Sequence, residues 1–297
     1  MLNCSIGIMA YNEEANIGNL LEALLIQKTH ICPIKEIYVV ASGCEDGTED
    51  IVRDYSKKDG RIKLLVQENR EGKASAVNLF LSVAQGEIIM LESADTIPAP
   101  GTIEKMAAPF FDPSVGMTGG RPVPVDSPDN FLGFTVNLLW RLHHMISLEH
   151  PKMGELIAFR NVVKEIPVDT AVDEASIEAI VTDAGFRIKY AEDAVVYNKG
   201  PENIREFIKQ RRRIAAGHIY VGKTQHHSVS TTSVTHILKP LLRDLKWSMK
   251  DILWTSGAVL LEAWGRFLGF YDFHVRKRNP FIWDISTSTK KLKGTIN

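Results

Sequence analysis

The chain has 297 residues, of which 44% are apolar, and its 35 Lys and Arg residues nearly balance its 36 Asp and Glu residues. This length and apolar fraction suit one large domain, or one domain with an appendage. The balanced charge excludes any argument for a nucleic-acid partner, and we expect none.

Cysteine usage and hydropathy narrow the class of protein further. Cys4, Cys32 and Cys44 form no CxxC pair, which indicates a reducing compartment and excludes a zinc-finger pattern. No stretch of about 18 uncharged apolar residues exists, so the sequence predicts no transmembrane helix. The N-terminus lacks the basic start of a signal peptide. These features predict a cytoplasmic protein.

Short apolar runs alternate with helical patterns over roughly the first hundred residues. We predict strands over residues 5–10, 36–40, 62–66 and 88–91, with a helix between each pair. This alternation predicts a doubly wound, mostly parallel α/β sheet with flanking helices. Right-handed crossovers then bring the carboxyl ends of these strands to one edge, where such sheets bind ligands.

The strand at residues 88–91 ends in Glu92, Ser93 and Asp95, and prolines follow. A carboxylate on such a turn can hold a divalent cation, which in turn can hold a diphosphate. An isolated strand end of this kind would be read as a solvated turn. Polar residues after the other three strands reach the same edge, which favours a binding site. Dinucleotide and P-loop motifs are absent.

The second half has a less regular pattern. We predict strands over residues 115–121, 154–160, 187–190 and 194–197, and helices over 131–146 and 173–183. A further helix begins near Pro201 and carries residues 210–214. His143, His144 and His218 receive no role, because histidines in such helices are more often core or interface residues.

From residue 235 the chain carries two apolar helical patterns that contain Trp254 and Trp264, with basic residues around them. Helices of this kind can lie in a membrane interface. They can equally pack on the domain or on a second subunit of a homodimer, and the sequence leaves both readings open. We therefore divide the chain into residues 1–225, with halves of about 1–120 and 121–225, and a C-terminal helical segment 226–297.

Six short motifs occur in a recognisable order. They are YNEE at residues 11–14, ASGCEDGTEDI at 41–51, EGKASAVN at 71–78, SADT at 93–96, DEASIEAIVTDAGFRI at 173–188 and QRRRI at 210–214. Over about residues 3–220 the chain resembles the family-two glycosyltransferases, which are inverting enzymes with a GT-A fold. The resemblance implies a GT-A domain that binds a nucleotide-sugar donor and Mg²⁺ or Mn²⁺.

The resemblance also implies roles for individual residues. Glu174 aligns with the general base, with Asp173 as its neighbour, and Asp95 aligns with the second Asp of the DxD metal motif, with Glu92 near it. Residues 154–160 match the acceptor-facing strand, which assigns Gly154 and Glu155 to the acceptor. The implied nucleotide-sugar contacts are Asn12, Glu13, Ser42, Asp46, Lys73, Asn78, Ser93, Gln210 and Arg213.

Three positions depart from the family pattern. Ser93 replaces the first Asp of DxD, so metal binding rests on Asp95 alone or with Glu92. Ala41 or Ser42 stands where the family usually has an acid that contacts uracil, so the base need not be uracil. Ile214 replaces the Trp of Q-x-x-R-W, which weakens the case for processive polymerisation.

The sequence thus predicts a metal-dependent, inverting glycosyltransferase. Its acceptor would be a glycan hydroxyl, a polyprenyl phosphate or another lipid-linked acceptor, and the C-terminal helices would place it peripherally on the cytoplasmic face of a membrane. Two alternatives stay open: a nucleotidyltransferase, and a catalytically inert protein that binds a sugar nucleotide or a lipid.

Overall fold

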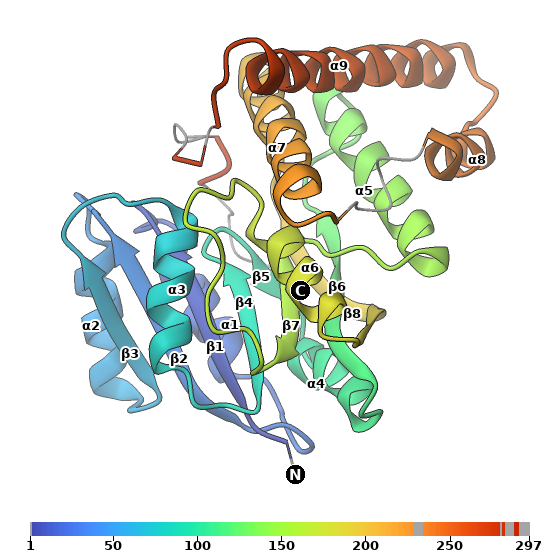
Figure 1. Ribbon diagram of the computed structural model, residues 1–297. Coiled ribbons are helices and arrows are strands. Elements are labelled where there is room, and N and C mark those ends of the chain that lie inside the picture. The colour runs from blue at the N-terminus through green and yellow to red at the C-terminus, as the bar shows by residue number, and fades with distance from the viewer. Residues whose placement is uncertain (1, 228–233, 280, 283–287, 291–297) are drawn as a thin grey trace.

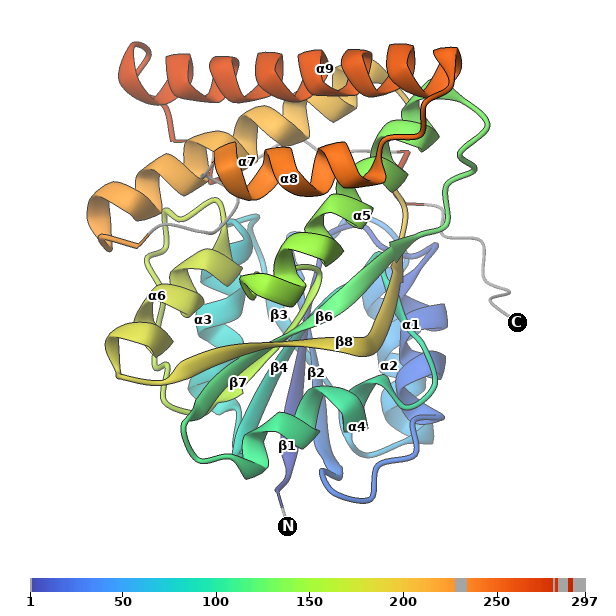
Figure 2. The same cartoon turned by 90° about the vertical axis from the view of Figure 1, so that its right-hand side faces the viewer.

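The computed structural model describes residues 2–227, 234–279, 281–282 and 288–290. Its centre is one eight-stranded sheet in the order β3-β2-β1-β4-β7-β6-β8-β5. Helices cover both faces of this sheet, and a layer of helices closes the end opposite the N-terminus (Figures 1 and 2).

The first half contains the parallel part of the sheet. Its elements are β1 (Cys4–Ala10), α1 (Ile17–Leu25), β2 (Ile34–Ser42), α2 (Thr48–Lys58), β3 (Ile62–Gln67), α3 (Lys73–Val83) and β4 (Ile88–Ser93). Strand β1 pairs in parallel with both β2 and β4, and β2 pairs in parallel with β3. The predicted doubly wound order is therefore confirmed, and the carboxyl ends of these four strands lie at one edge of the sheet.

The second half extends the sheet and builds the helical layer. Its elements are β5 (Ile97–Pro98), α4 (Thr102–Ala107), the 3₁₀ helix η1 (Ala108–Phe111), β6 (Val115–Pro124), α5 (Phe131–Glu149), β7 (Leu156–Arg160), α6 (Asp173–Asp183), β8 (Arg187–Asn198), α7 (Ile204–Thr224), α8 (Val234–Asp244) and α9 (Met249–His274). Strand β7 runs antiparallel to both β4 and β6, so the sheet is mixed beyond β4.

One expectation about the strands was wrong. The two short strands predicted for residues 187–190 and 194–197 form the single strand β8, which pairs in parallel with β6. The register shifts between Gly119 and Arg121 of β6, so β8 continues past the interruption in the apolar pattern. A polar break in a sequence pattern can thus mark a bulge within one strand.

The core has two layers because side chains of the central strands alternate between the two faces of the sheet. Ile88 and Met90 of β4 pack in the cluster on the α1 side, whereas Ile89 and Leu91 pack in the cluster that contains α3 and α6. Burial on both faces explains why β4 is a continuous apolar run. It also fixes the position of the polar residues that follow the strand.

Helix α9 packs across α7 at very short range. A Cβ atom on Gly269 would lie 2.5 Å from the carbonyl oxygen of Arg212, and one on Gly265 would lie 2.6 Å from Cβ of Arg211. The two helices are further joined by ion pairs between Arg211 and Glu262 and between Arg212 and Asp272. Figure 2 shows α9 lying over α7 with α8 below it. The C-terminal helices therefore pack on the domain through one side of α9.

The other side of α9 and its surroundings expose large apolar side chains. Trp247 is 85% exposed, Leu260 71% and Leu253 64%. Across the part of the chain that the structure describes, no helix is both long and apolar enough to cross a membrane.

The close contact between α7 and α9 gives a test of the packing. We expect Gly269→Ala to destabilise the protein by about 1–3 kcal/mol, because the added methyl group overlaps the α7 backbone and cannot be relieved by a rotamer change. Gly222→Ala in α7 is the matched control, since a Cβ added there would lie 3.6 Å from its nearest non-local atom. That control should leave stability unchanged or raise it by up to about 1 kcal/mol. Thermal denaturation compares the two, and equal melting temperatures would contradict the packing described.

Candidate active site

A cavity of about 1090 Å³ lies between the carboxyl ends of β1, β2 and β4 and the helical layer. Its lining contains most of the residues that the sequence analysis selects: Glu13, Ser42, Lys73, Glu92, Ser93, Asp95, Gly154, Glu155, Asp173, Glu174, Gln210 and Arg213. They come from separate segments of the chain, which the parallel strand ends and the helix starts bring together.

Asn12 and Asp46 do not line this cavity but join the loops behind it. Asn12 has a left-handed backbone (φ 52°), and its side-chain oxygen accepts a hydrogen bond from the Glu45 amide at 2.8 Å. Asp46 accepts from the amides of Glu14 at 3.1 Å and Thr48 at 3.0 Å. Both residues therefore lie behind the residues that line the cavity, where they fix the loops after β1 and β2.

Asn78 likewise lies outside the cavity lining. Its side-chain amide donates to the carbonyl of Ile166 at 2.9 Å, and its side-chain oxygen accepts from the Ile166 amide at 2.8 Å. This paired contact ties α3 to the segment that leads into α6. These contacts hold that segment in place, and the nucleotide-sugar contact that the resemblance implies for Asn78 stays a prediction.

The end of the cavity nearest β1 has an aromatic and basic wall. The guanidinium of Arg70 lies 4.1 Å from the centre of the Tyr11 ring, and both residues line the cavity. Lys290 donates to the carbonyl of Asn12 at 2.7 Å and forms an ion pair with Glu13 at 2.9 Å. Neither Arg70 nor Lys290 was selected from the sequence. Arg70 falls just before a matched motif, whereas Lys290 is 278 residues from Asn12 and gives no local signal.

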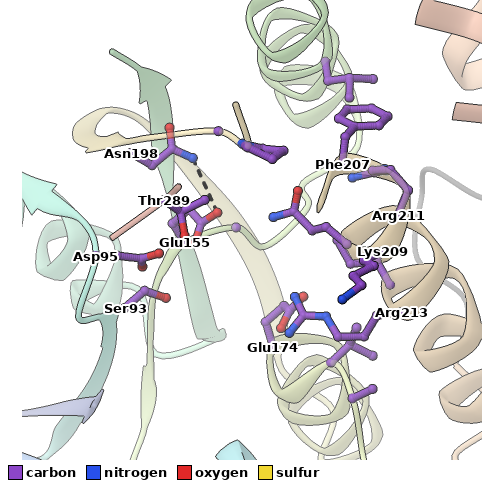
Figure 3. Close-up of a pocket in the computed structure, with 18 of the residues that line it drawn as sticks. Ser93, Asp95, Glu155, Glu174, Asn198, Phe207, Lys209, Arg211, Arg213 and Thr289 are labelled. Atoms are coloured by element: carbon purple, nitrogen blue, oxygen red, sulfur yellow. Dashed lines mark hydrogen bonds between the residues drawn. The ribbon is translucent and has the colours of Figure 1, made fainter. Parts of the chain in front are cut away.

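Carboxylates crowd the end of β4. Glu92 is only 2% exposed, and burial raises its pKa to about 8. Burial also raises the pKa values of Asp95 and Glu155. The negative charges of these two carboxylates add to the rise in the pKa of Glu92. Figure 3 shows Ser93 and Asp95 facing Glu155, whose carboxylate accepts from Asn198 at 3.4 Å. Lys73, Lys290 and Arg213 oppose the shift at Asp95, but burial has the larger effect on its pKa.

This group of buried carboxylates fits a divalent cation. Oε2 of Glu92 is buried without a hydrogen-bond partner, and Asp95 faces the open cavity beside it. The described residues contain no group of three or more His, Cys, Asp or Glu side chains arranged to hold a metal ion. Mg²⁺ commonly takes one or two carboxylates from the protein and completes its shell with water and substrate phosphates. The residues present fit such a partial site.

The first residues of α3 and α6 meet across the cavity. Nζ of Lys73 lies 3.1 Å from Oδ2 of Asp173, which is a largely buried ion pair. The next residue, Glu174, faces Arg213 of α7 in Figure 3. Burial and the adjacent Asp173 raise the pKa of Glu174 to about 7, although Lys73 and Arg213 oppose the shift. A carboxylate with a pKa near 7 is suited to accept a proton at neutral pH.

The comparisons with known proteins fit this geometry. Residues 5–159, slightly more than half of the chain, match the family model described as glycosyl transferase family 2. The chain belongs to glycosyl transferase family 2. The architecture described above is the mixed α/β sheet with flanking helices of the GT-A glycosyltransferases.

The proteins that are similar in sequence include the following two. Glycosyltransferase AglE of Haloferax volcanii is 26% identical over 235 residues, which are 73% of this chain and 73% of AglE. The poly-β-1,6-N-acetyl-D-glucosamine synthase of Staphylococcus aureus is 26% identical over 223 residues, which are 71% of this chain but only 53% of the synthase. The chain thus spans about half the length of that synthase.

The solved structures that share the fold include the following two. The mannosyltransferase PcManGT from Pyrobaculum calidifontis, in complex with GDP-Man and Mn²⁺, has a TM-score of 0.61 and 21% identity over 93% of this chain and 86% of its own. Glucosyl-3-phosphoglycerate synthase from Mycobacterium tuberculosis, with Mn²⁺, UDP and glucosyl-3-phosphoglycerate, has a TM-score of 0.51 and 15% identity over 74% of this chain and 79% of its own.

The family membership makes this chain a glycosyltransferase. It favours that activity over the nucleotidyltransferase and the inert binding protein that the sequence left open. The family match ends at residue 159, so Glu174 and Arg213 lie beyond it and their roles rest on the geometry of the cavity.

Proposed function

We propose that this glycosyltransferase transfers a sugar, with inversion, from a nucleotide-sugar donor to an acceptor hydroxyl in a metal-dependent reaction. The observation that carries the proposal is the meeting of Asp95 and Glu174 in one cavity, with Lys73 and Arg213 close to both carboxylates. An inverting transfer needs one group that holds the leaving diphosphate and another that deprotonates the acceptor.

In this proposal the donor lies against the carboxyl ends of β1, β2 and β4. Tyr11 and Arg70 form the wall at the nucleotide end, and Ser42 and Glu13 line the same region. A divalent cation bound at Asp95 would neutralise charge on the diphosphate. Lys73 and Arg213 add positive charge on the side of α3 and α7, where negative charge develops as the nucleoside diphosphate leaves.

Glu174 is the proposed general base. Its carboxylate takes the proton of the acceptor hydroxyl while the acceptor oxygen forms a bond to the anomeric carbon. The bond from that carbon to the diphosphate oxygen breaks on the opposite face, so the configuration inverts. Gly154 and Glu155, which directly precede β7, line the same cavity, and we propose that they contact the acceptor. A Cβ atom on Gly154 would lie only 3.0 Å from Cγ of Pro122, so the glycine allows β6 to approach this segment closely.

The donor site can be tested by thermal shift with nucleoside diphosphates, in the presence and absence of Mn²⁺. A ligand that binds only the folded protein stabilises it by about 2.7 kcal/mol when the ligand concentration is 100 times Kd. The melting temperature rises accordingly. We expect a shift that needs Mn²⁺ and disappears in Asp95→Ala. Asp193→Ala, at an exposed position of β8, is the control and should retain the shift. A shift that is independent of Mn²⁺ would refute the metal dependence.

The base can be tested by the pH dependence of nucleoside diphosphate release. Because Glu174 acts when deprotonated, the rate constant should fall as the pH drops through about 7 and should level off above it. Glu174→Gln should lower the rate at the plateau by roughly 10²–10⁴-fold, the usual contribution of a general base. Nucleotide binding should persist in this variant. A Glu174→Gln enzyme that keeps the rate and pH profile of the unaltered protein would remove Glu174 from the mechanism.

We also propose that the exposed apolar side of α8 and α9 rests on an anionic membrane surface. This surface comprises Leu238, Leu242, Trp247, Met249, Leu253, Leu260, Trp264 and Phe267, all more than half exposed. Lys239, Arg243, Lys246 and Lys250 flank it along the chain. An apolar helix face with basic neighbours suits the interface of an anionic bilayer, whereas a dimer contact has no need of the cations.

Membrane contact predicts that the protein sediments with anionic vesicles and less with neutral ones. In the Leu253→Asp/Leu260→Asp variant, vesicle binding should fall at least tenfold, since burial of one leucine contributes about 1.5–3 kcal/mol. Phe111→Asp, which alters an exposed apolar residue of η1 at the other end of the molecule, is the control. A concentration-dependent dimer that the double variant dissociates, with no vesicle binding by the unaltered protein, would assign the surface to a second copy instead.

A further inference from the structure

A cluster of basic side chains lines the same cavity on the side of the helical layer, away from β4. The members of this basic cluster are Lys152, before β7; His143, on α5; Arg211 and His218, on α7; and Arg266, on α9. The proposed chemistry at Asp95 and Glu174 does not use any of them.

The basic cluster has more positive than negative charge. Glu262 of α9 accepts from Arg211 at 2.5 and 2.7 Å and from Arg266 at 2.7 Å. The two guanidinium groups hold the pKa of Glu262 down at about 2, so it is ionised at any physiological pH. One carboxylate therefore pairs with two arginines, and both arginines line the cavity.

Lys152 is the third cation of the basic cluster. Among the residues that the structure describes, none forms an ion pair or a side-chain hydrogen bond with its ammonium group. Burial and the charge of Arg211 lower its pKa to about 8, so most of the population is still charged at pH 7. Lys152 is half-buried and lines the cavity, so an anionic ligand bound there would supply the counter-charge that the protein does not.

A second polar group in the cluster also lacks a partner. His143 is 7% exposed, its Nε2 lies 3.3 Å from the carbonyl of Met153, and its Nδ1 is buried without any hydrogen-bond partner. Burial and the nearby Lys152 lower the pKa of His143 to about 3, so the ring is neutral. Because Nε2 donates to the Met153 carbonyl, Nδ1 of the neutral ring is a hydrogen-bond acceptor, and it can accept from a hydroxyl group of a bound ligand.

Apolar side chains continue the cavity beyond the basic cluster. They come from α5, α8 and α9, and they are Leu138, Leu142, Ile146, Ile237, Leu238, Leu241, Ala258 and Val259. Leu238 and Val259 are also partly exposed on the outer surface. The cavity thus changes from cationic to apolar toward the helices that carry the exposed apolar surface.

We propose that this half of the cavity is the acceptor subsite, and that it binds an acceptor whose phosphate group lies in the basic cluster and whose apolar chain lies between α5, α8 and α9. The inference rests on the proposed function, because it names the class of acceptor. The phosphate could belong to a lipid-linked sugar or to a small phosphorylated sugar, and the apolar walls favour the lipid-linked one.

The proposed position of the acceptor phosphate differs from that of the donor diphosphate. Glu174 is, after Arg211, the charged group that most affects the pKa of Lys152, and it attracts the ammonium. A phosphate held by Lys152 therefore lies on the base side of the cavity, where an acceptor has to be. The donor diphosphate belongs on the Asp95 side, where a cation is required.

Isothermal titration calorimetry with three probes tests the proposal: farnesyl phosphate, farnesol and inorganic phosphate. We expect farnesyl phosphate to bind at least tenfold more tightly than either of the others, because only it satisfies both the cations and the apolar walls. Lys152→Met should weaken farnesyl phosphate binding at least tenfold. Lys105→Met, at an exposed position of α4, is the matched control and should bind like the unaltered protein.

The melting temperature of the ligand-free protein distinguishes a lysine that binds an anion from a lysine that stabilises the fold. Met keeps the apolar stem of Lys152 and removes the unpaired charge, so Lys152→Met should melt at a higher temperature than the unaltered protein. A lysine that holds the fold together would give a lower one. A stabilised variant that has lost affinity for farnesyl phosphate is the expected result.

Several outcomes would overturn the proposal. Equal binding of farnesol and farnesyl phosphate would leave no role for the cluster, and equal binding of inorganic phosphate and farnesyl phosphate would leave none for the apolar walls. Unchanged binding by Lys152→Met would place the phosphate elsewhere. The Mn²⁺-dependent nucleotide shift, measured on the same samples, reports the donor site independently. If that shift is missing while farnesyl phosphate binds, the proposed transfer fails and the anion site remains.

Discussion

The ion pair between Lys73 and Asp173 joins the two halves of the active site. Each residue is the first of its helix, α3 in the donor half and α6 in the acceptor half. A lysine is unfavourable at a helix N-terminus, where the macrodipole favours negative charge. The carboxylate of Asp173 offsets that cost in a site with little access to water, and it leaves Glu174 facing the cavity. The position of the proposed base therefore depends on a contact with a distant part of the sequence.

Much of the donor half followed from the sequence. The strands were short apolar runs, the parallel order followed from their alternation with helices, and parallel order sends polar strand ends to one edge. Helix α6 has the predicted bounds, since its acidic start and Gly185, with φ 85°, mark both ends locally. Local patterns could not show which motif residues line the cavity. Asn12 and Asp46 match positions that contact the ligand in the motif, but they form hydrogen bonds between the loops after β1 and β2 and do not line the cavity.

The sequence analysis selected Arg213 but missed its neighbour Arg211, as well as Lys152 and His143, because their contacts come from distant elements. The run Arg211 to Arg213 could be read as one solvated basic face, yet successive helix positions point about 100° apart. Arg211 therefore meets Glu262, Arg212 meets Asp272, and Arg213 faces Glu174. Lys152 and His143 become notable only when α7 and α9 are placed beside them. The charges of this cluster come from side chains on several helices and loops, so no single stretch of the sequence reveals the cluster.

The glycines at the crossing of α7 and α9 leave no space between the two helices. The backbone of α9 lies there against α7, with no long side chain between them. Arg213 belongs to α7, and the exposed apolar side chains belong to α9. The outer surface of the helical layer is therefore separated from the guanidinium that faces Glu174 by only one helix-to-helix contact.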